Sequence, residues 1–182
     1  MTKSNKNIEY IPIIMVLSKS YDYITTIPLE VTNYQDCYYQ DIINLMVEVN
    51  HFDNEEKAKE YLDNNILNNK EKYTNIYLAF IDQKLAGMCM LWEGYHFGEK
   101  RYRIHWLSVS LNHQKKGIAK SILSKIIEDF NGRNYDYPLY LVTSLQNIEA
   151  IRLYLKCNFE VYTKDLKDYS GEKAQNEMSK II

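Results

Sequence analysis

The segment QKKGIAKS, residues 114–121, has the residue types of a phosphate-binding loop at the start of a helix. An alternating strand pattern precedes it and an apolar helical pattern follows it, which predicts a strand that runs directly into a helix. The first N–H groups of a helix have no partner within it and lie at the positive end of its dipole, so they bind anions. Because Gly117 has no Cβ and Ala119 has a small one, an oxyanion could approach this backbone closely.

Side chains of the same segment strengthen this interpretation. Lys115, Lys116 and Lys120 would add positive charge, and Ser121 would add a hydroxyl donor. The segment is not a P-loop, because G-K-[ST] is missing, and it is not a dinucleotide-binding fingerprint, which needs two more glycines. Taken alone, the stretch could also be a surface turn with solvated lysines.

A second group of residues with possible roles at a ligand lies in NIEAIRLYLKCNF, residues 147–159. Asn147 is predicted to begin a helix and could leave its amide free for amide groups of a ligand. Ala150 would allow close packing of that helix. Asn158 would occupy the left-handed position after the helix, which glycine usually takes and asparagine tolerates.

One strand and two helices are expected before residue 73. The β-branched and aromatic run YDYITTIPLEV predicts a strand that ends near Val31. Apolar residues at three- and four-residue spacings predict a helix from about residue 35 to residue 49. Asp53 and Glu56 form a capping box that would begin a second helix, which should stop near NNK.

Strands are expected again from residue 73 onward. YTNIYLAFI and LAGMCMLW flank the turn DQK, which predicts a hairpin. The next run, YRIHWLSVS, should place Arg103, His105, Leu107 and Val109 together on one face of a strand.

The remaining chain predicts alternating helices and strands. A helix follows Gly117, then come the strand LYLV at residues 139–142, a helix from about Asn147 to Lys156, and closing strands at FEVYT and QNEMSKII. No repeat, linker or low-complexity tract divides the chain. We therefore expect one α/β (α+β) domain over residues 1–182.

Together these residues resemble the GCN5-related N-acetyltransferase (GNAT) superfamily. The resemblance is carried by Gln114-x-x-Gly117-x-Ala119 after an alternating strand and by Asn147-x-x-Ala150-x-x-Leu153-Tyr154-x-Lys156-x-Asn158-Phe159 further along the chain. Ala119 and Asn158 depart from the more frequent glycines. The resemblance covers roughly residues 24–182 and leaves residues 1–23 as an N-terminal extension or extra strand. It implies a central mixed, mostly antiparallel sheet of about six to seven strands flanked by four helices.

The resemblance also implies acetyl-CoA as the cosubstrate, and we expect no metal. The pyrophosphate would lie against backbone N–H groups from about Lys115 to Lys120, and the pantetheine arm would pair with the strand before the loop like an added strand. The implied cofactor contacts are Leu107, Ser108, Val109, Gln114, Lys115, Lys116, Gly117, Ile118, Ala119, Lys120, Ser121, Asn147 and Tyr154.

Acetyl transfer to an amine requires an acid and a base. The amine must lose a proton before it attacks the thioester, and the departing thiolate needs a proton back. The resemblance assigns the acid to Tyr154, although the chain has 17 tyrosines and a core position is the alternative. His105 is one candidate base, because an imidazole suits proton removal near neutral pH. Glu93 is the other. His51, His96 and His113 lie in expected loops and should be solvated.

The acceptor is expected to be an amine, with a small molecule favoured and a protein N-terminus also considered. Family members bind it between the first two helices and the loop after the hairpin, which correspond here to VNHFDN and EGYHFGEKR. Aromatic residues in or beside these loops could line an amine site through cation–π contacts; they are Phe52, Trp92, Tyr95 and Phe97. The rival hypothesis is an acyl-CoA-binding sensor or interaction module with the same fold and no catalysis.

Composition excludes several other classes. The 22 basic and 24 acidic side chains give a net charge of −2, which offers no general attraction to nucleic acid or to an anionic membrane. Three widely spaced cysteines suggest neither a disulfide framework nor a zinc site, which fits a cytoplasmic protein. The N-terminal YIPIIMVL is a poor match to a signal peptide and is better explained as a buried strand or hydrophobic arm. An exposed arm would suggest a homodimer.

Overall fold

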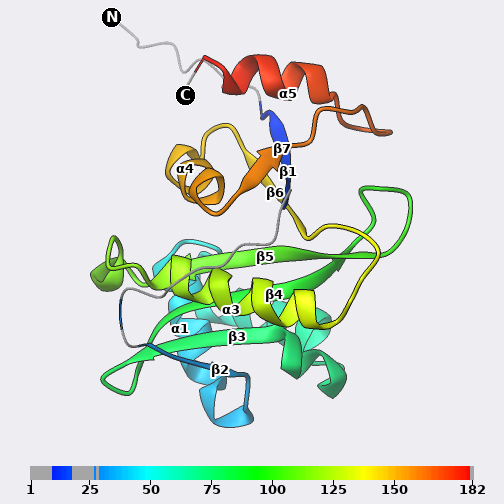
Figure 1. Ribbon diagram of the computed structural model, residues 1–182. Helices are drawn as coiled ribbons and strands as arrows, with labels where there is room; N and C mark the ends of the chain where they lie inside the picture. Colours follow the sequence, from blue (N-terminus) through cyan, green and yellow to red (C-terminus); the bar gives the residue numbers. More distant parts are fainter. Residues whose placement is uncertain (1–9, 18–26, 28, 181–182) are drawn as a thin grey trace, which may run out of the picture.

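The computed structural model describes residues 10–17, 27 and 29–180 and has a seven-stranded sheet with helices on both faces (Figure 1). Two apolar clusters pack against opposite faces of this sheet. One cluster contains the apolar faces of the first two helices, and the other contains the apolar faces of the helices that follow residues 114–121. Strand order is β2-β3-β4-β5-β6-β1-β7. The predicted mixed α+β fold is confirmed.

The strands have the following bounds: β1 Pro12–Leu17, β2 Glu30–Asn33, β3 Ile76–Ile81, β4 Lys84–Gly94, β5 Arg101–Val109, β6 Tyr140–Ser144 and β7 Phe159–Val161. Neighbouring strands are antiparallel except for β5 and β6, which are parallel. The predicted hairpin is β3–β4, and its turn residues Asp82 and Gln83 both have positive φ (48° and 63°), the signature of a tight two-residue turn. The sequence predicted β2 to end near Val31, and most of YDYITTIPLEV lies outside the described residues.

The α-helices have the bounds α1 Tyr39–Glu48, α2 Glu55–Tyr61, α3 Ile118–Gly132, α4 Ile148–Lys156 and α5 Gly171–Met178. Short 3-10 segments cover Asp36–Tyr38, Lys70–Asn75 and Leu111–His113, and α2 continues as a π-helical turn over Leu62–Ile66. The expected capping box at Asp53 and Glu56 is wrong by one residue. Asn54 caps α2, its side chain accepting from the Lys57 backbone N–H, while Asp53 pairs with the Lys57 ammonium.

Strand β1 lies inside the sheet, antiparallel to β6 on one side and to β7 on the other. Ile13 and Met15 are fully buried. The expectation of a buried strand in YIPIIMVL is therefore confirmed, whereas the exposed arm that suggested a homodimer is not found at residues 12–17.

The C-terminal segment QNEMSKII was expected to form a closing strand, and this is wrong. It contributes to α5, whose N-cap residue is Ser170, with the Ser170 hydroxyl accepting from the Lys173 N–H. Ala174 and Met178, four residues apart, are buried on the inner face of that helix. The strand position between β6 and β7 is already filled by β1, so no place is left there for a C-terminal strand.

A bulge in β5 changes which side chains share a face. Trp106 has φ 52°, and the register with β4 shifts between Met88, which faces Ser108, and Met90, which faces His105. Two residues of β5 thus lie opposite one residue of β4.

The expected alternation along β5 is therefore wrong beyond His105. Trp106 and Ser108 lie with His105 on the side of α1 and α2, where Trp106 packs beside Tyr61 and the Ser108 hydroxyl meets His51. Leu107 and Val109 pack on the opposite side, in the cluster that contains α3.

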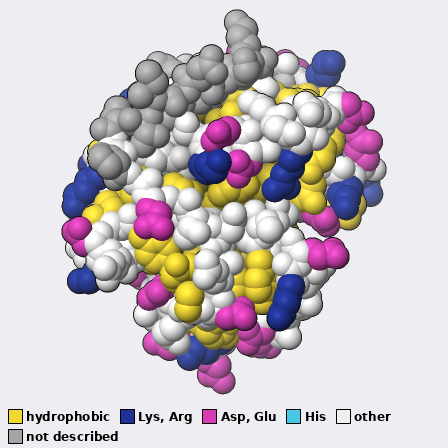
Figure 2. All heavy atoms as spheres, turned by 60° about the horizontal axis from the view of Figure 1, so that its bottom comes forward, with side chains coloured by type: hydrophobic (Ala, Val, Ile, Leu, Met, Phe, Trp, Pro, Cys, Tyr) yellow, Lys and Arg dark blue, Asp and Glu magenta, His cyan; other side chains and the backbone are white. Residues whose placement is uncertain are grey.

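The surface carries charges of both signs. Figure 2 shows Lys or Arg and Asp or Glu side chains interspersed on the face that it presents, with apolar side chains between them. None of the helices in the described part of the chain is long and apolar enough to cross a membrane.

Candidate functional site

A cleft opens where β5 and β6 diverge. The two strands pair only at Arg103 with Tyr140 and Ile104 with Leu141, although β5 continues to Val109. From Leu107 to Val109 the edge of β5 toward β6 has no ladder partner in the described sheet. An extended chain can pair with such an edge like an added strand.

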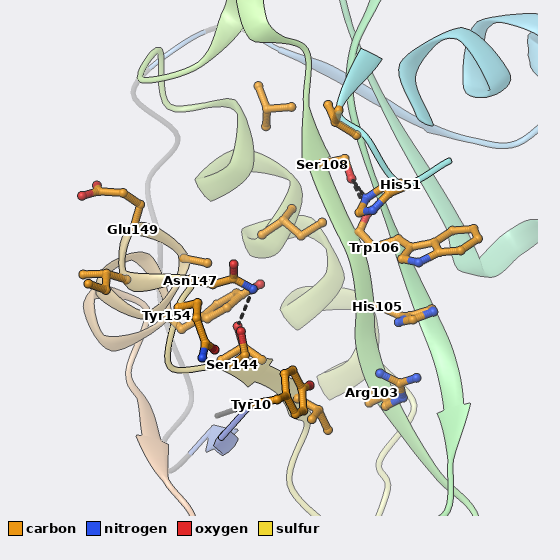
Figure 3. Close-up of a pocket in the computed structure, with 18 of the residues that line it drawn as sticks. Tyr10, His51, Arg103, His105, Trp106, Ser108, Ser144, Asn147, Glu149 and Tyr154 are labelled. Carbon is orange, nitrogen blue, oxygen red and sulfur yellow. Dashed lines mark hydrogen bonds between the residues drawn. The ribbon is translucent and has the colours of Figure 1, made fainter. Parts of the chain in front are cut away.

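The cleft encloses about 860 Å³ between β5 and the segment that runs from the end of β6 into α4 (Figure 3). Arg103, His105 and Trp106 follow one another along the β5 wall, and Ser144, Asn147 and Tyr154 belong to the opposite wall. Tyr10, just before β1, also lines it.

The start of α3 has the geometry that the sequence predicted for an anion site. Gly117 is the N-cap residue with φ 86°, a left-handed conformation that favours glycine, and no side chain caps the helix. Lys115 also has positive φ, 61°. Residues 115–121 follow directly after Gln114, which lines the cleft, although they do not line it themselves.

The side chains expected to assist this loop are less available than the sequence suggested. The Ser121 hydroxyl donates to the Gly117 carbonyl at 3.2 Å and is buried, so it is not a free donor for a ligand. The Lys116 ammonium donates to the Asn112 carbonyl, and the Gln114 amide to the Val109 carbonyl at 3.4 Å. The Ile118 side chain is buried in the core and does not face a ligand at this loop. The backbone, more than the side chains, offers the anion site.

The helix that carries Tyr154 also follows its prediction closely. Asn147 caps α4 without a side-chain cap bond, and its amide donates to the Thr143 hydroxyl at 3.4 Å while lining the cleft. Asn158 has φ 60°, which confirms the left-handed position after the helix. Ala150 also lines the cleft.

Tyr154 lies in the cleft wall with only 8% of its surface exposed. Burial raises the pKa of its phenol well above the ordinary value, and the nearby thiols of Cys89 and Cys157 raise it further. The hydroxyl therefore remains protonated at neutral pH. That is the state in which it could donate a proton, and its catalytic role remains a prediction.

The two candidate bases lie in different places. His105 lines the cleft and stacks on Trp106 with ring centroids 5.1 Å apart. Burial, then the neighbouring Arg103 and His51, lowers its pKa to about 3. Glu93 does not line this cleft. It accepts from the Lys100 ammonium at 3.1 Å and borders a separate cavity of about 220 Å³ beside Lys72 and Trp92.

Two histidines expected to be solvated take part in the site instead. His51 lies 2.7 Å from the Ser108 hydroxyl through Nε2, and burial lowers its pKa. His96 lies 3.1 Å from the Tyr140 hydroxyl through Nδ1. Both line the cleft. They come from loops, and only the return of those loops over β5 and β6 brings them there. His113, whose ring lies 3.5 Å from the Ser110 hydroxyl, stays outside.

The aromatic residues proposed for an amine site are not found in the cleft. Phe52 packs against Tyr61 and Trp106, and Phe97 packs against Tyr140 and Tyr162. Trp92 belongs to the smaller cavity, and Tyr95 is 65% exposed. Sequence reasoning placed Arg103 on one face with His105 but gave it no role, and it placed Trp106 on the other face; both line the cleft.

Stability should depend on pH through His105. Its pKa of about 3 in the folded protein lies below the ordinary 6.5, so the unfolded chain binds more protons between these values. The free energy of unfolding should therefore fall as pH falls through that window, by at most about 1.4 kcal/mol per pH unit from this group. Urea unfolding at several pH values should give a flatter slope for His105→Gln than for the wild type.

The control for this experiment is His113→Gln, which changes a histidine outside the cleft. It should keep the wild-type slope. Equal slopes in His105→Gln and the wild type would mean that His105 is not a buried neutral imidazole in solution. Because burial also lowers the pKa of His51 and His96, part of the slope should persist in every variant.

Comparison with known proteins points to one family. Residues 34–159 match the model of the acetyltransferase (GNAT) family. No curated protein matches the chain. A solved structure of a putative GNAT acetyltransferase from Novosphingobium aromaticivorans is similar with a TM-score of 0.59 and 17% identity, over 85% of this chain and 62% of that one.

Two further solved structures share the fold. A GNAT acetyltransferase from Colwellia psychrerythraea gives a TM-score of 0.64 at 13% identity, over 84% of this chain and 53% of that one. The aminoglycoside N-acetyltransferase AAC(6')-Iy in complex with CoA gives a TM-score of 0.62 at 13% identity, over 78% of this chain and 93% of that one. The chain covers 53–62% of the length of three of the solved structures that it matches, including those from Novosphingobium aromaticivorans and Colwellia psychrerythraea.

Proposed function

The chain belongs to the acetyltransferase (GNAT) family, and on that basis we propose that it transfers an acetyl group from acetyl-CoA to the amine of a small molecule. The amine attacks the thioester directly, with both substrates bound at once. The observation that carries the proposal is the arrangement of three features: the unpaired edge of β5 and Tyr154 of α4 line one cleft, and the uncapped start of α3 lies three residues after Gln114, which lines the same cleft.

The residues present suit a CoA thioester. The unpaired backbone of residues 107–109 can hydrogen-bond the amide groups of the pantetheine arm, and the Asn147 amide lies across the cleft from it. The start of α3, with Gly117 in a left-handed conformation and no capping side chain, can accept the pyrophosphate. Acetyl-CoA supplies the activated acyl group.

Proton transfer is assigned to side chains of the cleft. Tyr154, kept protonated by burial, donates to the departing sulfur. His105 is neutral and accepts the proton of the attacking amine. Because its conjugate acid has a low pKa, it would hold that proton only briefly, and transfer through water to the solvent completes the step. His51 is the second neutral imidazole on this wall.

One observation favours the rival function, a CoA-binding module without catalysis. Among the described residues that line the cleft, both imidazoles on the β5 side have lowered pKa values and the Glu149 carboxylate accepts from Arg152, while Glu93 lies elsewhere. A sensor would need the cofactor site and no more.

The test is amine-dependent release of CoA. The purified protein should bind acetyl-CoA in calorimetry and should release free thiol in the presence of an acceptor amine, followed with a thiol reagent. Tight binding with no release for any amine in a broad panel would support the sensor. Absence of acetyl-CoA binding would contradict both functions.

A further inference from the structure

Arg103 differs from the other three arginines of the chain, because among the described residues its guanidinium has no carboxylate or amide oxygen as a partner. Its Nε is buried and has no hydrogen-bond partner among the described residues. The hydroxyls of Tyr140 and Tyr61 favour its charge, whereas the imidazoles of His96 and His105 are close enough for that charge to lower their pKa values. The other three have oxygen partners: Arg101 donates to Glu99 (2.9 Å), Arg133 to Asn75 (2.9 Å) and Arg152 to Glu149 (3.1 Å).

The position of Arg103 is built into the sheet. It lies on β5 at the closed end of the cleft, opposite Tyr140 of β6 in the ladder, and lines the cleft beside His105 (Figure 3). Gly94 on the neighbouring strand makes room for it, since a Cβ there would lie 2.9 Å from Arg103 Cδ and 3.0 Å from Nε. The side chain is thus held in the cleft wall and is not a free surface arginine.

An unpaired guanidinium in such a place is costly. Burial of the Nε–H group without a hydrogen-bond partner carries a desolvation penalty that nothing in the described wall offsets. Burial accordingly lowers the pKa of Arg103. An anion bound in the cleft would supply the missing partner, and the planar guanidinium suits the oxygen atoms of a carboxylate or a phosphate.

The phosphates of acetyl-CoA do not fill this role. Their proposed site is at the start of α3, beyond the end of β5 at Val109. Arg103 lies six residues earlier on the same strand, roughly 20 Å away at about 3.3 Å per residue. The partner of Arg103 must therefore belong to the other substrate.

The charges of the cleft also disfavour an acceptor with several positive groups. Glu149 is the sole carboxylate among the described residues that line it, and that carboxylate accepts from Arg152 on the same helix. A polyamine or an aminoglycoside would bring several cations toward Arg103 with no free counter-charge in the described wall.

We propose that the acceptor is a small primary amine that also carries a carboxylate or phosphate group, which the guanidinium of Arg103 binds. The proposal rests on the acetyltransferase function proposed above and narrows its substrate class. Arg103 would hold the anionic end of the acceptor and leave the amine free to reach the acetyl group beside His105 and Tyr154.

Calorimetry on the protein with and without saturating CoA tests this without requiring turnover. The probes are matched pairs: the twenty amino acids and their carboxamides, phosphoethanolamine and ethanolamine, glucosamine 6-phosphate and glucosamine. Spermidine serves as the polycation. The variants are Arg103→Gln and Arg103→Lys, and the control is Arg101→Gln, which changes an arginine two residues away on β5 that pairs with Glu99 outside the cleft.

We expect the anionic member of at least one pair to bind about tenfold or more tightly than its neutral partner, equivalent to the 1.4 kcal/mol of a tenfold change. Arg103→Gln should remove that preference, Arg103→Lys should keep part of it, and Arg101→Gln should keep all of it. The pair that shows the preference distinguishes a carboxylate from a phosphate.

Equal or tighter binding of the neutral amines or of spermidine, a preference that survives Arg103→Gln, or no binding by any anionic amine would overturn the assignment. Release of CoA, followed on the same samples, separates this from the proposed function. Acetylation of neutral amines alone would support the acetyltransferase function and contradict the anion site at Arg103. Arg103-dependent binding with no acetyl transfer would do the reverse.

Discussion

Gly117→Glu should abolish the binding of acetyl-CoA, with an affinity loss of about 100-fold or more. Two effects combine at this position. Gly117 has φ 86°, a conformation that costs an L-residue about 1–2 kcal/mol. The new carboxylate would also occupy the positive end of α3 and repel the pyrophosphate, and like charges in contact cost several kcal/mol. Calorimetry with acetyl-CoA on the wild type and the variant measures the loss.

A matched control exists at Gly98, in the loop between β4 and β5. Its φ of 80° gives Gly98→Glu a comparable backbone strain, but an added Cβ there would meet nothing within 4 Å, and Gly98 does not line the cleft. The control should lose some stability and keep its affinity for acetyl-CoA. If Gly117→Glu binds as tightly as Gly98→Glu, the start of α3 is not the phosphate site.

Tyr154→Phe should lower kcat by about 10²- to 10⁴-fold, the range that a general acid contributes. The change removes one hydroxyl and keeps the aromatic ring that packs against Phe159 at 6.0 Å, so that α4 should stay in place. Acetyl-CoA affinity should change by no more than about threefold, because the cofactor contacts proposed for the backbone of β5 and α3 are untouched. Steady-state rates with the preferred amine, beside calorimetry, separate the two quantities.

The control for this variant is Tyr77→Phe. Tyr77 is 1% exposed in the core and does not line the cleft, so that removing its hydroxyl should leave kcat near the wild-type value. A Tyr154→Phe variant with an unchanged kcat would assign Tyr154 to packing alone and would leave the release of CoA without a proton donor from α4.

These expectations differ in how far they depended on the three-dimensional structure. The site at Gly117 and the placement of Asn147, Tyr154 and Asn158 could be predicted because each depends on neighbours within one loop or one helix. A helix start needs a particular backbone conformation at one residue, and a helical face repeats every three or four residues. The observed φ values of Gly117 and Asn158 agree with that reasoning.

The acceptor side of the cleft could not be predicted in the same way. The alternation expected along β5 assumed a constant period of two, and the left-handed Trp106 breaks it, so that His105 and Leu107 lie on opposite faces. The sequence RIHWLSV does not predict that bulge, because tryptophan is not a residue that favours positive φ. In the folded chain Trp106 packs against Tyr61 of α2 and Phe52 of the preceding loop, contacts that lie far from it in the sequence.

The sequence by itself determined the family, the glycine-capped start of α3 and the helix that presents Tyr154, since these depend on short-range spacing. Only the tertiary structure decided that Glu93 lies outside the cleft, that His51 and His96 enter it and that β1 fills the sheet between β6 and β7. Only it showed Arg103 without a counter-charge among the described residues. Whether a charge is paired depends on contacts between segments far apart in the chain, which local patterns do not encode.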